Sequence, residues 1–245
     1  MIRSRVELNH GANIKMKTRF LALATLIGFA WSGFTQTQPA MPKAAPKEPA
    51  FERVTDDFKL PRVLLIGDSI SMGYTIPVRR LLQGKANVHR IPENGGPTTN
   101  GLAKLPKWLG DGKWDVIHFN WGLHDLKLLA DGKHQVSADA YERNLRELVR
   151  RLKVTGAKLI WASTTPVPEG KLNPPRANTD VLAYNAIARR IMEENQIVTD
   201  DLYRFVLPQL SKIQRPENVH FTSEGSDALA QEVAMSIGSA LAGKK

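Results

Sequence analysis

Short apolar runs alternate along this chain with longer segments in which apolar residues recur every three or four positions. The apolar runs are the expected strands, at residues 63–66, 87–91, 115–120, 159–163 and 196–199. The periodic segments are the expected helices, at residues 76–82, 101–109, 137–154, 179–194 and 223–241. A continuous apolar run suits a strand that is covered on both faces, whereas the longer spacing gives a helix one apolar face.

This alternation predicts an α/β fold, a three-layer α/β/α sandwich around a mainly parallel sheet of five strands. The helix over residues 137–154 has the clearest pattern, because several leucines share one of its faces. Ser137 stands before its first turn and is expected to cap it. In a sheet of this kind, ligands bind just beyond the C-terminal ends of the strands. Residues that directly follow a strand are therefore the first candidates for a functional site.

The N-terminal part of the chain has a different pattern. Met16-Lys17-Thr18-Arg19 precedes an apolar run over residues 20–34, and small or polar residues follow it. That layout is typical of a secretory signal peptide. The run is shorter than the ~20 residues that span a bilayer, although a retained membrane anchor is the alternative. We therefore expect an N-terminal extension and signal peptide over residues 1–36, and export to the periplasm or the medium.

The next segment, residues 37–57, is rich in proline and alanine and has few large side chains to bury. It is expected to be an extended linker. The folded domain is expected to comprise residues 58–245.

Composition removes several functional classes. The chain has no cysteine, which excludes disulfides, a thiolate nucleophile and cysteine-ligated metals. Seven Lys and Arg residues against two Glu residues give the first 50 positions a net charge of +5, and the remaining 195 residues carry the other +5. A domain this mildly basic gives no electrostatic reason to expect a nucleic-acid partner. No spacing of histidines and carboxylates suggests a metal site, and no phosphate-binding loop is present, so we expect no cofactor.

The first candidate for chemistry is Gly67-Asp68-Ser69-Ile70, which directly follows the first predicted strand. A serine at the turn from a buried strand into a helix is held where a nucleophile must be. Its own N–H and the helix N-terminus can face a developing negative charge. The alternative is that Ser69 only caps the helix.

Four segments, in order along the chain, resemble the blocks of the SGNH (GDSL-type) hydrolases, a family of serine esterases and lipases. They are Gly67-Asp68-Ser69-Ile70, Glu93-Asn94-Gly95-Gly96-Pro97-Thr98, Gly122-Leu123-His124-Asp125 and Glu217-Asn218-Val219-His220-Phe221-Thr222. Three of them directly follow predicted strands. The resemblance covers roughly residues 60–240 and implies the flavodoxin-like SGNH hydrolase fold and ester hydrolysis without a cofactor.

The resemblance also implies a role for five residues. Ser69 is the expected nucleophile and His220 the general base that takes its proton. Glu217 is the expected carboxylate that orients His220. The backbone N–H groups of Ser69 and Gly95 and the side chain of His124 are expected to form the oxyanion hole.

Two of these positions depart from the family pattern. Glu217 stands where aspartate is usual, and the acids Asp200 and Asp201 at the end of the fifth strand can cap or orient locally, Asp201 being interpreted as structural. His124 stands where the family has asparagine. A neutral imidazole also carries one N–H donor, so His124 can replace that amide. The alternative is a weakened site or one with a different role.

Four residues are weaker candidates for substrate contact: Asp68, Gly96, Trp121 and Arg176. Asp68 is expected to organise its turn, and Trp121 to be either a core residue or part of the site. Arg176 ends a proline-rich loop after the fourth strand, over the expected site, where it faces either an acidic or polyhydroxylated substrate or solvent.

The resulting expectation is a serine ester hydrolase that acts through an acyl-enzyme on small O-acyl groups of carbohydrates. This substrate class comes from the resemblance. A lipid-directed esterase, lysophospholipase or thioesterase is the alternative within enzymes, and a catalytically weak carbohydrate-binding protein is the alternative from a different class. The expected partner is a small-molecule or glycan ester, without nucleic acid and without a stable membrane span after signal cleavage. Nothing in the pattern indicates an oligomeric state.

Overall fold

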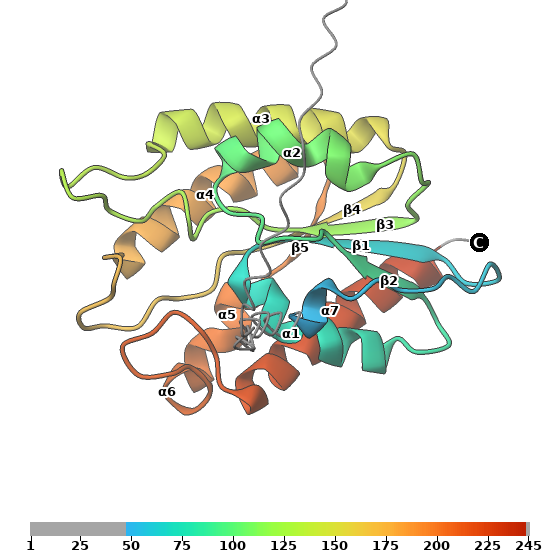
Figure 1. Ribbon diagram of the computed structural model, residues 1–245. Coiled ribbons are helices and arrows are strands. Elements are labelled where there is room, and N and C mark those ends of the chain that lie inside the picture. The colour runs from blue at the N-terminus through green and yellow to red at the C-terminus, as the bar shows by residue number, and fades with distance from the viewer. Residues whose placement is uncertain (1–47, 244–245) are drawn as a thin grey trace, which may run out of the picture. The chain divides into compact units, whose positions relative to one another are not determined.

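The computed structural model describes residues 48–243 (Figure 1). The predicted signal peptide and most of the predicted linker lie outside these residues. Within the described range, no helix combines the length and apolar character needed to cross a membrane.

Five parallel strands form one sheet. They are β1 (Arg62–Ile66), β2 (Asn87–Arg90), β3 (Val116–Phe119), β4 (Lys158–Ala162) and β5 (Val198–Asp200). Their order in the sheet is β2-β1-β3-β4-β5, with Leu64 of β1 beside His89 of β2 and Ile117 of β3. The chain passes from β1 outward to β2 and then returns to β3 on the other side of β1. The strand order therefore reverses between β1 and β3, and a crevice is expected at their C-terminal ends.

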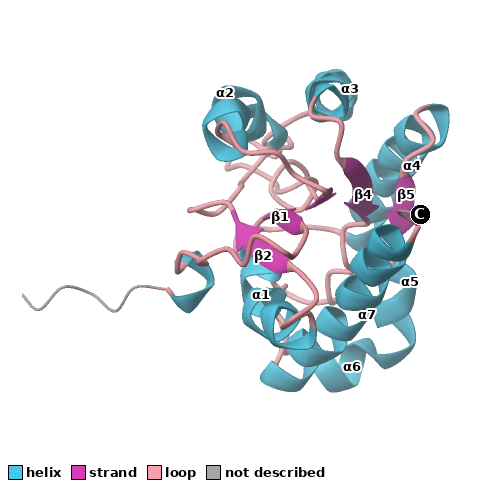
Figure 2. Ribbon diagram, turned by 90° about the vertical axis from the view of Figure 1, so that its right-hand side faces the viewer, coloured by secondary structure: helices cyan, strands magenta, loops and turns pink. Residues whose placement is uncertain are grey.

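Helices cover both faces of this sheet. They are α1 (Ser69–Leu81), α2 (Thr98–Leu109), α3 (Ala138–Val154), α4 (Asn178–Glu194), α5 (Leu202–Val206), α6 (Leu210–Ile213) and α7 (Ser223–Ala242), with two 3₁₀ turns, η1 (Pro49–Phe51) and η2 (Leu207–Gln209). In Figure 1, α2 and α3 lie above the sheet and α1 and α7 lie below it. Figure 2 shows the strands between the two layers of helices. The predicted three-layer α/β/α sandwich with a parallel five-stranded sheet is confirmed.

Alternating side chains of the strands supply two hydrophobic cores, one on each face. On β1, Leu64 and Ile66 pack with residues of α2, α3 and α4, whereas Val63 and Leu65 pack with residues of α1 and α7. Because both faces of the sheet are buried, β1 and β4 are apolar at every position after the first residue, rather than at every second position. This is the reason that continuous apolar runs located the strands.

Two parts of the fold differ from the sequence prediction. Helix α1 begins at Ser69, seven residues before the predicted start at residue 76. Its first turn is small and polar, which hides the periodicity, and the side chain of Asp68 caps it by accepting a hydrogen bond from the N–H of Ile70 (2.9 Å). The short helices over residues 202–213 were not predicted, because four or five residues are too few to show a period.

The described chain begins with a segment that is packed on the domain. In η1, Ala50 is only 1% exposed, and η1 lies against α1. The Arg79 side chain of α1 donates a hydrogen bond to the carbonyl of Glu52 (3.0 Å). The chain is thus attached to the domain ahead of residue 58, within the range that the sequence assigns to the linker.

Candidate active site

The turn after β1 and the loop before α7 bring Ser69 and His220 together. Nε2 of His220 lies 2.8 Å from Oγ of Ser69, although 151 positions separate the two residues in the sequence. Both side chains are half-buried, so the pair remains open to solvent on one side. A hydroxyl within hydrogen-bond distance of an imidazole nitrogen is the arrangement that activates a serine nucleophile. The structure thus brings together the predicted nucleophile and the predicted base.

Asn218 holds the other side of the His220 ring. Its Oδ1 lies 2.7 Å from Nδ1 of His220, and the backbone N–H of His220 donates to the same oxygen (2.9 Å). A backbone N–H only donates, so the amide atom that faces it must be the oxygen. Because that oxygen accepts, Nδ1 carries the ring proton. Nε2 is then unprotonated and accepts from the Ser69 hydroxyl, which is the tautomer that a general base requires.

Glu217, the predicted orienting carboxylate, does not contact His220 in this structure. Its backbone is left-handed, with φ of 49°, and its exposed side chain points toward Gly170. A Cβ atom added at Gly170 would lie 3.3 Å from the Glu217 carboxylate. The turn therefore directs residue 217 away from the imidazole and residue 218 toward it. The sequence prediction chose the wrong one of two neighbouring residues as the contact to Nδ1.

The acids at the end of β5 have other partners. Oδ2 of Asp200 lies 2.9 Å from Nε2 of His118, and both side chains are fully buried. Asp201 caps α5 and pairs with Arg189 (2.9 Å). The prediction that Asp201 is structural agrees with these contacts, and neither acid hydrogen bonds to His220.

The surroundings of His220 favour its neutral form. Burial lowers the pKa of the imidazole, and the positive charges of Arg215 and Arg176 lower it further, while Asp68 acts in the opposite direction. A base whose pKa lies below its ordinary value is unprotonated at neutral pH. His220 is therefore ready to accept the Ser69 proton without first losing one.

His124 lies in the loop after β3, half-buried, and its ring makes no hydrogen bond within the described part of the chain. Burial lowers its pKa, as do Arg176, Lys127 and His220, against an opposing effect of Asp68. His124 and His220 lie close enough for the charge of one ring to affect the other. At neutral pH His124 is uncharged and keeps one N–H donor, as an oxyanion hole requires.

Asp125 does not hold the His124 ring. Its Oδ1 accepts from the backbone N–H of Thr98 (2.9 Å) and from the Thr98 hydroxyl, at the start of α2. The side chain is fully buried, and burial raises its pKa to about 7 against the opposing effect of these hydrogen bonds. Asp125 therefore joins the loop after β3 to α2.

The glycines of the second block make their own hydrogen bonds. The N–H of Gly95 donates to the carbonyl of Gly67 (3.0 Å), and the N–H of Gly96 donates to Oδ1 of Asn94 (2.9 Å). A Cβ at residue 95 would lie 2.8 Å from the Gly67 oxygen, so this close approach requires glycine. The N–H of Gly95, which was expected to be an oxyanion donor, is thus already hydrogen-bonded to Gly67, because the two loops pack directly on each other. The N–H of Ser69 has no such acceptor among the described residues.

Arg90, at the end of β2, is a residue that the sequence prediction missed. It is buried, and its Nη2 donates to the carbonyls of Gly67 and Asp68 (both 2.9 Å) and to Oγ of Ser71 (2.8 Å). These contacts fasten the turn that presents Ser69. The ring of Phe51 lies 5.2 Å from its guanidinium carbon. An arginine within a predicted strand was the available signal, since a buried arginine needs partners.

The weaker candidates for substrate contact have different outcomes. Nε of Arg176 donates to the carbonyl of Leu123 (2.8 Å), so Arg176 supports the loop that carries His124 and lies near the site. Trp121 is 1% exposed and packs in the core, where a Cβ at Gly101 would lie 2.9 Å from its ring. Asp68 is 4% exposed. Both side chains are thus almost fully buried in this structure, and substrate contact by Trp121 or Asp68 stays a prediction.

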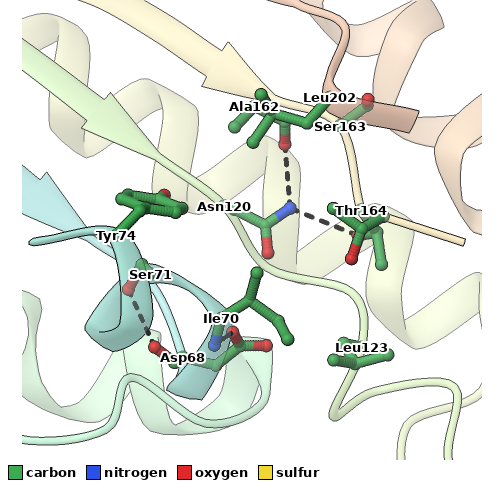
Figure 3. Close-up of a pocket in the computed structure, with 11 residues that line it drawn as sticks. Asp68, Ile70, Ser71, Tyr74, Asn120, Leu123, Ala162, Ser163, Thr164 and Leu202 are labelled. Carbon is green, nitrogen blue, oxygen red and sulfur yellow. Dashed lines mark hydrogen bonds between the residues drawn. The ribbon is translucent and has the colours of Figure 1, made fainter. Parts of the chain in front are cut away.

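One cavity adjoins the pair, and a second lies behind the turn that carries Ser69. A groove of about 420 Å³ is lined by both Ser69 and His220. Its other walls are Glu48, Pro49, Ile70, Met72, Gly73, Ile76, Arg215, Phe221 and Ser226. The second cavity, of about 10 Å³, is lined by polar and apolar side chains that include Asp68, Tyr74, Asn120 and Thr164 (Figure 3). It has room for about one water molecule. No cluster of three His, Asp or Glu side chains suited to a metal occurs among residues 48–243.

Comparisons with known proteins show the family and the fold of this chain. The model of the GDSL-like Lipase/Acylhydrolase family matches residues 65–228. Solved structures with a similar fold include the acetyl xylan esterase AlAXEase, with a TM-score of 0.63, 17% identity and coverage of 72% of this chain and 99% of that chain. A lipase/acylhydrolase from Enterococcus faecalis has a TM-score of 0.64 and 21% identity, with coverage of 73% of this chain and 96% of that chain. Axe2, an acetylxylan esterase from Geobacillus stearothermophilus, has a TM-score of 0.61 and 22% identity, with coverage of 73% of this chain and 94% of that chain.

A comparison with curated proteins finds no match. The structural likenesses, all at low identity, support the fold. The family match spans β1 to the first turns of α7 and includes every residue of the Ser69, His220 and Asn218 arrangement. The chain belongs to the GDSL-like lipase/acylhydrolase family and is an ester hydrolase.

Proposed function

We propose that this hydrolase cleaves esters through an acyl-enzyme formed on Ser69, with small O-acyl groups on carbohydrates as its substrates. The observation that carries the catalytic part is the 2.8 Å contact between Nε2 of His220 and Oγ of Ser69, in a tautomer fixed from the other side of the ring. His220 then serves as the base and Ser69 as the nucleophile.

In the first half of the reaction, Oγ of Ser69 bonds to the acyl carbon while its proton moves to Nε2 of His220. The carbonyl oxygen becomes an oxyanion, which the N–H of Ser69 and the ring N–H of His124 stabilise. As the intermediate collapses, the bond to the alcohol breaks and the alcohol oxygen takes the proton from His220. Water repeats the same steps on the acyl-enzyme, which releases the acid and restores Ser69.

The cavities favour a short acyl group. The small cavity behind the turn has a volume of about 10 Å³, which is too small for an acyl chain. The groove beside the pair is larger, at about 420 Å³, and its rim carries Glu48, Arg215 and Ser226, which suit a polar alcohol such as a sugar. Acetyl xylan esterases among the structures of similar fold support this substrate class.

The groove also favours a second candidate, a lipid-directed esterase or thioesterase. Its lining includes Met72, Ile76 and Phe221, and Ile76 is 40% exposed. An acyl chain that lay along this surface would bury apolar area. A longer chain in the groove would then increase affinity, which a short-acyl esterase would not show.

One set of assays tests both candidates. Ser69→Ala is expected to lose nearly all turnover of p-nitrophenyl acetate and all labelling by a fluorophosphonate, with an unchanged melting temperature. Wild-type protein is expected to prefer acetate over longer p-nitrophenyl esters and to release acetate from acetylated glycans. A preference that rises with chain length supports the lipid-directed candidate. Turnover by Ser69→Ala above a tenth of the wild-type rate contradicts the nucleophile assignment. A wild-type protein that is neither labelled nor active contradicts the esterase proposal and favours the alternative of a carbohydrate-binding protein.

We also propose that the chain is exported. The signal-like pattern over residues 16–36 supports this proposal. Fractionation of cells that express the full sequence, beside a version that starts at residue 37, tests it. Equal distribution of both forms in the cytoplasm would contradict export.

A further inference from the structure

The amide of Asn218 occupies the place that a carboxylate holds in a Ser-His-Asp triad. We infer that Asn218 is the positioning residue for His220, so that the site is a Ser69-His220-Asn218 triad in which Glu217 takes no part. This inference rests on the proposed function, because it assigns a role toward the base of that reaction.

The first support is the pair of hydrogen bonds that Oδ1 of Asn218 accepts. One comes from Nδ1 of His220 (2.7 Å) and the other from the backbone N–H of the same residue (2.9 Å). An amide can present either its oxygen or its NH₂ group, and the wrong choice would put the ring proton on Nε2. The backbone donor removes that choice, because only the oxygen can accept from it. Asparagine can therefore orient the base as reliably as a carboxylate at this position.

The second support is the turn that carries both residues. The N–H of Asn218 donates to the carbonyl of Arg215 (3.3 Å), and the N–H of Arg215 donates to the carbonyl of His220 (2.9 Å). Gln214 donates from its side chain to the carbonyl of Val219 (3.2 Å). These bonds hold the turn between α6 and α7 without any contribution from the exposed side chain of Glu217.

The third support is electrostatic. Charged and titratable groups that act on His220 come from four places: Asp68 before α1, His124 after β3, Arg176 before α4, and Arg215 on its own loop. Only Asp68 favours the imidazolium form, and it is buried beneath the turn. A neutral amide at Nδ1 orients the ring but adds no negative charge. The His220 imidazole of this triad therefore becomes protonated at a lower pH than it would with a carboxylate at residue 218.

Three variants separate orientation from charge. Asn218→Leu keeps the approximate size but removes the acceptor, and it is expected to lower kcat by about 10²–10⁴-fold with little change in KM. Asn218→Asp keeps an acceptor for both donors and adds a charge. It is expected to stay active and to move the acidic limb of kcat/KM to higher pH, because that limb reports the base of the free enzyme. Glu217→Gln, the matched control from the next position, is expected to leave both kcat and the limb unchanged.

The assay is hydrolysis of p-nitrophenyl acetate by the full chain over a wide pH range, with circular dichroism melting as the folding control. An unmoved acidic limb in Asn218→Asp, or a loss in Glu217→Gln as large as in Asn218→Leu, would overturn the inference. If Asn218→Leu does not fold, the limb of Asn218→Asp decides alone. Ser69→Ala distinguishes failure of the proposed function from failure of this inference. Full activity of Ser69→Ala would contradict the proposed function. An inactive Ser69→Ala, together with wild-type behaviour of both Asn218 variants, would contradict only the role of Asn218.

Discussion

His124 is the residue whose chemistry differs most from the amide that its family position implies. An asparagine amide carries two N–H donors and a neutral imidazole carries one, which the ring places farther from the backbone. Burial and the nearby cations lower the pKa of the ring and so favour its neutral form, which carries one N–H donor. The loop contacts made by Arg176 and Asp125 fix the backbone on both sides of His124.

Removal of the His124 side chain tests this donor. Loss of one oxyanion donor typically costs ~10²–10³ in turnover, so His124→Ala should lower kcat by about that factor with little change in KM. His124→Asn should recover part of the loss, because it restores a side-chain N–H. Steady-state kinetics with p-nitrophenyl acetate provide the measurement. Full kcat in His124→Ala would leave the oxyanion to backbone donors and give His124 a role in binding or packing.

The pH dependence of activity follows from the charges near His220. The base acts only when neutral, so kcat/KM should be constant above its pKa and fall as the pH decreases through it. Burial and the two arginines lower that pKa, which keeps the enzyme active in mildly acidic solution. Arg215→Gln removes one positive charge, so the acidic limb should move to higher pH. The movement should be small, since Arg215 is exposed and solvent screens its charge.

Arg215→Lys is the matched control, because it keeps the charge and should keep the limb in place. High salt should reduce the difference between Arg215→Gln and wild type, since it screens the charge that the substitution removes. A limb that moves equally in the lysine and glutamine variants would show that Arg215 acts through the loop, by its hydrogen bond to the carbonyl of Phe221.

At the scale of elements, the sequence predicted the strands and helices that have a periodic apolar pattern. Strands β1 to β5 and the long helices α3, α4 and α7 were found within a few residues, because burial on one or both faces sets the spacing of apolar residues. The start of α1 and the helices after β5 were not found, since a capped polar turn and a five-residue helix leave no period. The order of blocks also pointed to Ser69 and His220, whose side chains the structure brings within hydrogen-bond distance.

The rest of the site depends on backbone geometry that a sequence does not display. Whether residue 217 or residue 218 reaches Nδ1 is decided by the left-handed backbone at Glu217. Whether the N–H of Gly95 is free is decided by how closely two loops approach. Arg90 acts on carbonyls of a different element, and a sequence gives no direct sign of such a partner.

The contact between the loops after β1 and β2 gives a prediction at this scale. Gly95→Ala would place a methyl group 2.8 Å from the oxygen and 3.1 Å from the carbon of Gly67, both backbone atoms that cannot turn aside. We expect a loss of about 1–3 kcal/mol in the free energy of unfolding, together with a marked loss of kcat as the Ser69 turn shifts. Chemical denaturation and steady-state kinetics measure the two effects.

Gly238→Ala is the control, because a Cβ there meets nothing within 4 Å and the residue lies inside α7. It should stabilise the protein by about 0.5–1 kcal/mol and leave kcat unchanged. Equal stability of Gly95→Ala and wild type would show that the two loops can separate without cost.

For the whole molecule, Asp125 connects parts of the upper helical layer to the sheet. It accepts two hydrogen bonds from Thr98 at the start of α2, and the Thr98 hydroxyl in turn accepts from Asn144 of α3 (3.0 Å). Oδ2 of Asp125 is buried without a partner in the described chain. An ionised carboxylate in this position lacks compensation for part of its lost hydration. The network is therefore best satisfied when Asp125 carries a proton.

Because burial raises the pKa of Asp125 from 3.8 to about 7, the folded protein holds a proton there that the unfolded chain has already released. This contribution to the free energy of unfolding is complete below the unfolded pKa and is lost as the pH rises through about 7. Asp125→Asn cannot ionise, so its melting temperature relative to wild type should rise between pH 5 and pH 8. Differential scanning calorimetry at several pH values measures this, with Asp227→Asn, at an exposed ion pair with Arg80, as the control that should run parallel to wild type. Parallel melting curves for Asp125→Asn and wild type would show that the carboxyl stays ionised in the folded protein, and that Oδ2 has found a donor such as water.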